Sequence, residues 1–257
     1  MLESKDSGRR RTALVTGASR GIGAAIARAY ASAGMRVAVH YGSSHGAAEQ
    51  TLASLPGDGH LLVHADVSDA EEVRTMVSAA EEALGGLDVL VNNAGIFEAT
   101  PFDAPDFDAW CSGWSRVLDT NLMSAAHATW AALPGMRARG GGKVINTASR
   151  SAFRAETEAP AYAVSKAGMV SLTRCLARAE AKNGILAYCI APGFVETAMA
   201  RESVRELGLE ALTADIPLGR IATVKDVAGV ALFLASPAAD YLTGITIPVA
   251  GGSWMWT

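Results

Sequence analysis

The sequence predicts one α/β domain with a doubly wound, mostly parallel sheet and helices on both faces. Short apolar runs alternate with helical patterns along the whole chain, which is typical of parallel sheets covered by helices. The 257 residues suffice for one sizeable domain, and half of them are hydrophobic, so a large core can form. The 26 glycines suit the many tight turns that such a fold needs between strands and helices.

Seven short runs rich in apolar residues are predicted strands, as expected for a sheet buried on both faces. They cover residues 12–16, 36–41, 60–66, 87–92, 143–148, 185–194 and 242–252. Apolar residues at helical spacing predict the helices between them. These cover residues 24–34, 69–84, 114–138, 161–180 and 224–235. The charged residues 1–11 are predicted to form a flexible N-terminal arm, so residues 12–257 form the single domain.

Two further segments are predicted to lie near the carboxyl edge of the sheet. Residues 97–109 contain two prolines and are predicted as a surface loop. Residues 194–216 are predicted as a lid over the site, irregular at first and helical at about 198–208. Gly193 precedes this segment and could act as its hinge.

Charge and composition argue against several functional classes. The net charge of −4 at pH 7 disfavours nucleic acid or an anionic membrane surface as the main partner. No apolar run approaches the roughly 18 residues of a membrane span, and the N-terminus lacks the apolar core of a signal peptide. The three cysteines form no CxxC pair and the histidines show no metal spacing. We therefore expect buried thiols, no metal site and a cytoplasmic protein.

The first strand, a glycine-rich turn and a helix follow one another directly, and this order indicates dinucleotide binding. The turn reads TGASRGIG at residues 16–23. Glycines let the backbone approach a pyrophosphate, and the N-terminus of the helix offers free N–H donors and a positive dipole end. The spacing is GxxxGxG, which differs from the commoner GxGxxG.

The end of the second strand favours NADP over NAD as the cofactor. Many dinucleotide folds place a carboxylate there to hold the adenosine ribose. Here Tyr41 and Ser43 occupy the region, so no carboxylate would repel a 2′-phosphate, and Arg20 in the glycine turn could pair with one. Arg20 could equally be a solvated surface charge, and NAD is not excluded.

A second group of residues suggests carbonyl chemistry. Tyr162 and Lys166 are four apart, so on a helix their side chains share one face. A nearby ammonium lowers the pKa of a phenol. Ser149 ends a predicted strand, where open α/β sheets bind ligands. Asn121 lies inside a predicted helix, either facing solvent or making a specific hydrogen bond. The alternative is an ordinary amphipathic helix with a surface Tyr and Lys.

Taken together, these motifs resemble the short-chain dehydrogenase/reductase family, a Rossmann-fold family, from about residue 11 to residue 253. The motifs that carry the resemblance are TGASRGIG (16–23), Asp66, NNAG (92–95), Asn121, Ser149, YxxxK (162–166) and PGFVET (192–197). The chain looks most similar to the 3-oxoacyl-(acyl-carrier-protein) reductases, through IPLGR (216–220) and TGITIPVAGG (243–252).

The resemblance implies a role for each of four residues. Tyr162 would be the general acid in reduction and the base in oxidation. Lys166 would hold the nicotinamide ribose and lower the pKa of Tyr162. Ser149 would hydrogen-bond the substrate oxygen. Asn121 would bend its helix locally and hold a water that relays protons from Lys166.

The implied cofactor contacts lie in the glycine turn, at the ends of the next three strands, on the Tyr–Lys helix and after the sixth strand. They are Gly17, Ser19, Arg20, Gly21, Ile22, Gly23, Tyr41, Ser43, Asp66, Val67, Asn93, Ala94, Gly95, Tyr162, Lys166, Pro192, Gly193, Val195 and Thr197. Of these, Asp66 and Val67 would meet the adenine, and Thr197 the nicotinamide carboxamide.

The substrate and its contacts stay open at this point. A 3-oxoacyl thioester, a sugar, a steroid or another small alcohol all fit the motifs, and so does a non-catalytic dinucleotide sensor. The candidate substrate contacts, besides the lid, are Phe97, Arg150, Phe153, Arg154, Glu156 and Phe194. The two arginines favour an anionic substrate, but Glu156 and Glu158 nearby offset them.

The resemblance also implies a homotetramer or homodimer. The aromatic C-terminus SWMWT is consistent with a subunit interface. The alternative is that Trp254 and Trp256 fold back onto their own domain.

Overall fold

The computed structural model describes residues 9–198, 205 and 208–255. Its strands follow the seven predicted runs. They are β1 (Thr12–Val15), β2 (Arg36–Tyr41), β3 (Leu61–His64), β4 (Val89–Asn92), β5 (Gly142–Thr147), β6 (Ile185–Pro192) and β7 (Thr246–Val249). They form one sheet in the order β3-β2-β1-β4-β5-β6-β7, and every adjacent pair is parallel. This confirms the predicted single-domain, doubly wound fold.

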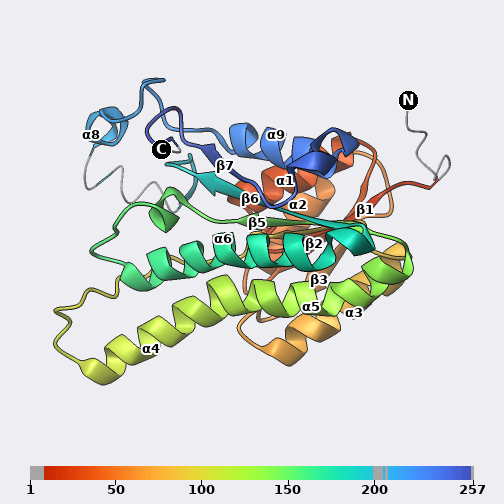
Figure 1. Ribbon diagram of the computed structural model, residues 1–257, viewed down its shortest axis with the longest axis horizontal. Helices are drawn as coiled ribbons and strands as arrows, with labels where there is room; N and C mark the ends of the chain where they lie inside the picture. Colours follow the sequence, from red (N-terminus) through yellow and green to blue (C-terminus); the bar gives the residue numbers. More distant parts are fainter. Residues whose placement is uncertain (1–8, 199–204, 206–207, 256–257) are drawn as a thin grey trace.

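Helices connect the strands and cover both faces of the sheet (Figure 1). The described α-helices are α1 (Gly21–Ser32), α2 (His45–Ala53), α3 (Ala70–Leu84), α4 (Phe107–Leu118), α5 (Ser124–Ala138), α6 (Pro160–Glu180), α8 (Leu209–Thr213) and α9 (Val224–Ala235). A π-helix at Asp119–Met123 joins α4 to α5. Short 3-10 turns lie at Arg150–Ala152, Ala181–Asn183 and Pro237–Leu242.

Alternation along the strands divides the core between the two faces of the sheet. Along β1, Ala13 and Val15 pack with α1, α2 and α9 in one buried cluster. Leu14, which points to the other face, packs with α3, α5 and the end of α6 in a second cluster. Because both faces are covered, the strands are apolar nearly throughout.

The strand order places a ligand-binding crevice at the carboxyl edge of the sheet. The chain moves from β1 outward to β2 and β3, then returns to β4 on the other side of β1. The connections that leave β1 and β4 therefore diverge, and such a switch point is where open α/β sheets bind ligands. Most predicted site motifs follow the end of a strand or begin the helix after it, whereas Asn121 lies in the π-helix between α4 and α5.

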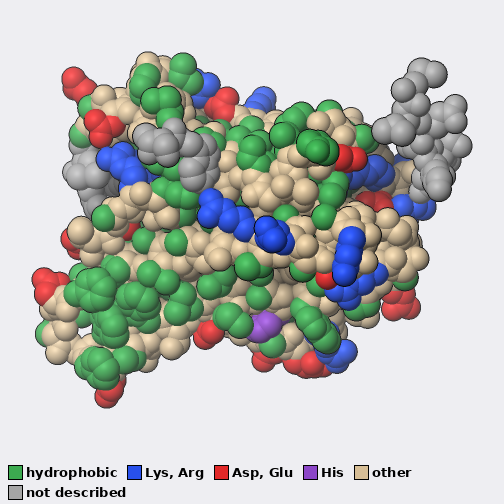
Figure 2. All heavy atoms as spheres, in the orientation of Figure 1, with side chains coloured by type: hydrophobic (Ala, Val, Ile, Leu, Met, Phe, Trp, Pro, Cys, Tyr) green, Lys and Arg blue, Asp and Glu red, His purple; other side chains and the backbone are tan. Residues whose placement is uncertain are grey.

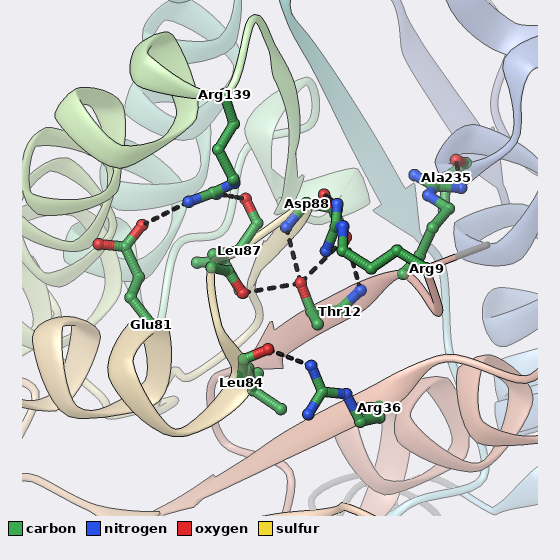
Figure 3. A network of polar contacts seen from close by, with 11 residues as sticks. Arg9, Thr12, Arg36, Glu81, Leu84, Leu87, Asp88, Arg139 and Ala235 are labelled. Carbon is green, nitrogen blue, oxygen red and sulfur yellow. Dashed lines mark hydrogen bonds and ion pairs between the residues drawn. The ribbon is translucent and has the colours of Figure 1, made fainter. Parts of the chain in front are cut away.

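Ion pairs and arginine–carbonyl bonds close the opposite, amino edge (Figure 3). Asp88 Oδ2 accepts hydrogen bonds from the Thr12 backbone N–H at 2.7 Å and from Thr12 Oγ1 at 3.0 Å, and Arg9 pairs with Asp88 Oδ1 at 2.6 Å. Arg36 donates to the Leu84 carbonyl at the end of α3, where basic side chains are favourable. Burial raises the pKa of Asp88, but the bonds from Arg9 and Thr12 outweigh it and hold the pKa below its usual value.

These contacts bear on the predicted N-terminal arm. Residues 1–8 of the arm lie outside the described residues. At its end, Arg9 is paired with Asp88, Arg10 with Asp58, and Arg11 donates to the Ala235 carbonyl at 2.6 Å. The described end of the arm is therefore tied to the domain.

Several predicted boundaries are wrong for local reasons. The loop predicted at 97–109 ends early, because Asp106 accepts hydrogen bonds from the Asp108 and Ala109 N–H groups and starts α4 at Phe107. No helix was predicted at α2, whose buried stripe is only Ala48 and Thr51. Of the helix predicted at 198–208, most residues lie outside the described part.

The exposure of one cysteine differs from the prediction, and one part of the surface is rich in hydrophobic side chains. Cys189 is buried as expected, but Cys175 is exposed, because it lies on the solvent face of α6. Hydrophobic side chains gather over α4 in Figure 2, where Phe102 and Phe107 are 77% and 73% exposed. None of the described helices is both long enough and apolar enough to cross a membrane.

Candidate active site

The glycine turn lies tightly against the residues that follow β4. Gly17 and Gly21 have φ values of +62° and +60°, in the left-handed region that favours glycine. A Cβ at Gly17 would lie 2.9 Å from the Ala94 Cα, and one at Gly23 would lie 2.3 Å from the Gly17 carbonyl oxygen. A larger side chain at either position would therefore push the turn open.

The N-terminus of α1 has no side-chain cap, as is also the case for α2, α5, α6 and α8. Its N-cap is Arg20, whose side chain makes no capping bond, and its first turn holds no acidic residue. By contrast, the carboxylate of Asp69 caps α3, that of Asp106 caps α4 and the hydroxyl of Thr223 caps α9. The free N–H groups and the dipole of α1 thus suit a bound phosphate, and the glycine turn leaves room for one.

Thr16 joins the glycine turn to the NNAG segment. Its Oγ1 accepts hydrogen bonds from the backbone N–H groups of Asn93 at 2.9 Å and Ala94 at 3.0 Å. The Asn93 side chain donates to the Thr16 carbonyl at 3.0 Å and to the Gly17 carbonyl at 3.3 Å. These hydrogen bonds fix Asn93 and Ala94 against the glycine turn, in the crevice between β1 and β4.

His40 also fixes this turn, and the sequence analysis did not single it out. It is 2% exposed, and its Nδ1 accepts a hydrogen bond from the Gly17 N–H at 2.9 Å. Nε2 then carries the proton and donates to the Ala65 carbonyl at 3.1 Å. Burial lowers the pKa of His40, which favours this neutral form. A lone histidine on a predicted strand gives no signal of such a contact.

The remaining predicted adenosine contacts lie at the ends of β2 and β3. The Tyr41 ring packs against His45 and His64, with ring centroids 5.0 and 5.2 Å apart, and Ser43 is exposed just beyond β2. Asp66 Oδ1 accepts hydrogen bonds from the Ser68 N–H and hydroxyl, which lower the pKa of the carboxyl group. Val67 is buried beside it. These residues form one wall of the crevice, and hydrogen bonds from Ser68 hold the Asp66 carboxylate in place.

The predicted contacts after β6 return toward the glycine turn. Gly193 donates its N–H to the Val249 carbonyl at 3.0 Å, and Val195 pairs with Ala222 in an isolated bridge. The Thr197 Cγ2 would lie 3.6 Å from a Cβ at Gly21. The segment that begins at Phe194 therefore crosses over the N-terminus of α1, as a cofactor contact there requires.

Asn121 occupies the π-helix between α4 and α5. It is fully buried, and its Oδ1 accepts a hydrogen bond from the Ile96 N–H at 2.7 Å. Its Nδ2 donates to the Ile96 carbonyl at 2.9 Å and to Ser165 Oγ at 3.1 Å. Of the two sequence interpretations, the hydrogen-bonding one holds. The extra residue of the π-turn lets the amide reach across to the segment after β4.

Lys166 lies beside this amide in the protein interior. It is 4% exposed, and Nζ donates to the Thr147 carbonyl at 2.9 Å. A Cβ at Gly95 would lie 3.1 Å from Asn121 Oδ1 and 3.3 Å from Lys166 Nζ, so both side chains meet at this glycine. Burial lowers the pKa of Lys166 to about 8, against a smaller opposing effect of Cys189.

Tyr162 and Ser149 complete the group. Lys166 Nζ lies 5.6 Å from the centroid of the Tyr162 ring, and Phe97 packs edge-on against the same ring with centroids 5.1 Å apart. Ser149 is 9% exposed, and its Oγ accepts a hydrogen bond from the Ser151 N–H at 3.1 Å. The Ser149 hydroxyl also acts on the Tyr162 phenol and lowers its pKa.

The electrostatics of Tyr162 differ from the sequence-based expectation. We expected Lys166 to lower its pKa. Instead burial raises the pKa of the phenol, and the opposing effects of the Ser149 hydrogen bond and of the Arg150 guanidinium are smaller. The Lys166 ammonium donates to the Thr147 carbonyl. Tyr162 is therefore protonated at neutral pH, as a proton donor must be.

The candidate substrate contacts form pairs of aromatic and charged groups around Ser149. The Arg150 guanidinium lies over the Phe194 ring, 4.0 Å from its centroid. Phe153 stacks on Trp254 with centroids 4.2 Å apart. Trp254 thus folds back onto its own domain, and Trp256 lies outside the described residues. Arg154 is exposed on the surface.

Comparisons with known proteins agree with this geometry. A family model described as enoyl-(acyl carrier protein) reductase, one of the models of the short-chain dehydrogenase/reductase family, matches residues 17–253. The chain is 38% identical over 247 residues to the 3-oxoacyl-(acyl-carrier-protein) reductase FabG of Staphylococcus aureus, covering 95% of this chain and 98% of that one.

Relatives with other names are about equally similar. A galactitol 2-dehydrogenase of Agrobacterium fabrum is 36% identical over 256 residues, covering 95% of this chain and 98% of that one. A crystal structure described as a candidate gluconate dehydrogenase from Agrobacterium tumefaciens superposes with a TM-score of 0.88 at 34% identity, covering 95% and 96% of the two chains. The chain is therefore an oxidoreductase that belongs to the short-chain dehydrogenase/reductase family.

Proposed function

We propose that the protein transfers a hydride between NADP(H) and a carbonyl group or the corresponding secondary alcohol. The observation that carries the proposal is the meeting of Asn121 and Lys166 at Gly95, with the Tyr162 ring 5.6 Å from Lys166 Nζ. Ser149 acts on the Tyr162 phenol. When bound, the nicotinamide would supply or accept the hydride. The substrate carbonyl would then lie against Tyr162 and Ser149, on the side of the group open to the segment after β6.

Each of the four side chains has a distinct task in this proposal. In reduction, the Tyr162 phenol gives its proton to the carbonyl oxygen, and the Ser149 hydroxyl stabilises the negative charge that develops there. Lys166 binds the nicotinamide ribose and passes a proton toward Tyr162. Asn121 positions the segment that contains Gly95 and orders the water through which Lys166 exchanges protons with solvent.

At neutral pH the Tyr162 phenol is protonated, and burial raises its pKa further above the usual value. A protonated phenol is ready to act as an acid, whereas oxidation of an alcohol needs the phenolate as base. We therefore expect oxidation to become faster as the pH rises toward the pKa of Tyr162, and reduction to become slower.

The NADP preference rests on Arg20 and on the neutral residues that follow β2. Arg20 is exposed at the N-cap of α1, and no ion-pair partner faces its guanidinium within the described part of the chain. We expect Arg20→Ala to weaken NADPH binding at least about tenfold and NADH binding far less, since a charge-assisted bond to the 2′-phosphate would be lost. Fluorescence titration of each cofactor measures this. Equal losses for both would mean that Arg20 does not read the 2′-phosphate.

The substrate proposal is a 3-oxoacyl thioester, by the similarity to the S. aureus reductase. A sugar, a polyol or a related small alcohol is the second candidate, because the galactitol dehydrogenase is about equally similar. Oxidation of NADPH and NADH with a β-ketoacyl thioester, keto sugars, a steroid ketone and simple ketones would separate them. Tight cofactor binding without turnover of any carbonyl or alcohol would favour the dinucleotide sensor instead.

We also infer a homodimer or homotetramer. Its support is the exposed aromatic surface over α4, which includes Phe102 and Phe107 and is larger than isolated surface residues would explain (Figure 2). Light scattering of the purified protein tests this inference, and a monomer at micromolar concentration would contradict it. A cytoplasmic location stays a prediction of the sequence.

A further inference from the structure

Arg150 differs from the other arginines of the described chain. Among the described arginines, Arg11, Arg36, Arg139 and Arg150 are partly shielded from solvent. Arg11 donates a hydrogen bond to the Ala235 carbonyl, Arg36 to the Leu84 carbonyl and Arg139 to the Leu87 carbonyl. The Arg150 guanidinium donates none to any residue that the structure describes. The N–H donors of this half-buried guanidinium are therefore left to solvent, and a ligand with suitably placed acceptors could replace the water.

The surroundings of Arg150 fix its orientation without using its donors. One face of the guanidinium lies on the Phe194 ring at 4.0 Å from the centroid. This stacking occupies the face of the plane and leaves the in-plane N–H edge open, and that edge matches a carboxylate in a bidentate pair. Burial lowers the pKa of Arg150, but a guanidinium of this basicity stays charged.

Arg150 also lies close to the proposed chemistry. It follows Ser149 directly, and its charge acts on the Tyr162 phenol. Phe194, on which it stacks, begins the segment that follows β6. The guanidinium therefore borders the space between the proposed proton donor and that segment, where part of a substrate would extend from its carbonyl group.

No neighbouring carboxylate among the described residues forms an ion pair with the Arg150 guanidinium. Glu156 and Asp215 both act on its charge, but within the described residues neither lies within ion-pair distance of it. The Glu156 carboxylate accepts a hydrogen bond from Ser151 Oγ at 3.3 Å. Asp215 and Arg154 are exposed, where water screens their charges. The sequence left two arginines and two glutamates balanced against each other. The structure favours Arg150 as the charged group that would contact a substrate.

We propose that Arg150 binds a carboxylate of the substrate, so that the substrate is an oxo acid in one direction and the matching hydroxy acid in the other, in place of the thioester or polyol that similarity to relatives favours. The proposal rests on the oxidoreductase function proposed above, because the carbonyl must reach Tyr162 while the carboxylate reaches Arg150. A bidentate pair at this half-buried position would orient the substrate as well as bind it.

The test compares oxo acids with their methyl esters. A series of oxo acids that differ in the number of methylenes between ketone and carboxylate is assayed with the wild-type protein, Arg150→Met and Arg150→Lys. We expect the wild type to prefer one acid over its ester. Arg150→Met should lose about 30-fold more kcat/KM on that acid than on the ester, mainly through KM. Arg150→Lys should retain part of the preference, because it keeps the charge but not the fork.

Arg154→Met is the matched control, because it removes the same charge from the same loop at an exposed position. It should leave the ratio of acid to ester activity unchanged. An equal change in Arg154→Met would mean that the general field, and not a contact with Arg150, selects the acid. Equal losses on acid and ester in Arg150→Met would mean that Arg150 acts only through Tyr162. Either result overturns the proposal.

Other outcomes separate this proposal from the proposed function. Turnover of neutral ketones without preference for any acid overturns the carboxylate site and leaves the oxidoreductase function intact. Absence of turnover with every compound would contradict the proposed function. Calorimetric binding of the oxo acids to the cofactor-loaded wild type and to Arg150→Met then decides the carboxylate site by itself, since equal affinities for the two proteins would exclude it.

Discussion

Polar groups at the two edges of the sheet differ in how they are paired. At the amino edge each group shown in Figure 3 meets a partner in the protein, as Asp88 meets Arg9 and Thr12. At the carboxyl edge the N-terminus of α1 has no side-chain cap, and Lys166 is buried at the cost of a lowered pKa. The contacts at the amino edge therefore stabilise the fold. At the carboxyl edge, a bound ligand would lower the free energy of groups that are uncapped or buried with an unfavourable charge.

This difference explains how one fold can be stable and still carry a reactive site. At the amino edge, Arg11 ends on the Ala235 carbonyl and Arg9 on the Asp88 carboxylate. Near the proposed site, Lys166 ends on the Thr147 carbonyl, whereas Arg150 ends on no residue that the structure describes. Burial also lowers the pKa of Lys143 away from the site, so a shifted pKa alone does not mark a functional group.

The largest expected effect is on turnover at the carboxyl edge. Tyr162→Phe removes only the proposed proton donor, so we expect about a thousandfold lower kcat with cofactor binding nearly unchanged. Tyr188→Phe is the matched control: it removes a buried phenol that donates to the Ala239 carbonyl at 3.1 Å, away from the proposed site. That variant should lose about 1 kcal/mol of unfolding free energy and keep its kcat. Retained turnover in Tyr162→Phe would remove Tyr162 from the mechanism.

The second prediction concerns the energetic cost of Lys166. Its pKa falls from 10.5 to about 8 on folding, so the folded state binds fewer protons between these values and gains stability as the pH rises. Below about pH 8 the full cost of roughly 3 kcal/mol applies. Lys166→Met should therefore be inactive but more stable than the wild type at pH 7, and the gain should shrink toward pH 10.5.

Urea unfolding of the cofactor-free proteins at several pH values measures this difference directly. Comparing the two proteins at each pH cancels the other titrating groups. A gain that stays constant with pH would show that the ammonium is not destabilised by burial.

The third prediction concerns the amino edge and is the smallest. Asp88→Ala should lower the unfolding free energy by about 2 kcal/mol at pH 7 through the loss of the bonds from Thr12 and Arg9, while the kcat of the folded protein is unchanged. The pKa of Asp88 is lowered in the folded protein, so its contribution is present above about pH 4 and is lost as the pH falls through the folded value. Denaturation at pH 7 and pH 3 measures this. Asp58→Ala, at an exposed pair with Arg10, is the control and should change little.

The sequence alone predicts the fold well, because its strands and glycine turn are strong local signals. All seven strands appear near their predicted residues, and the all-parallel order follows from the helical connections. Helix α2 was missed because so few of its residues are buried. The start of α4 was missed because the prolines before Asp106 look like a loop, although they precede a helix cap.

The structure brings several predicted site residues together, but their electrostatics were not predictable from the sequence. Motif spacing identified Asn121 and Lys166, and the π-helix brings them together at Gly95. The role of His40 depends on a tertiary contact with Gly17 that no local pattern encodes. The raised pKa of Tyr162 depends on burial, which outweighs the charge effects that sequence spacing suggested.

Hydrogen–deuterium exchange of the protein with and without NADPH tests the contrast between the two edges most directly. We expect NADPH to slow exchange in peptides that contain residues 16–23, 92–95 and 162–166, and to leave peptides around Thr12, Leu84 and Asp88 unchanged. Protection confined to the amino edge, or none at either edge at saturating NADPH, would contradict the assignment of the carboxyl edge as the active site.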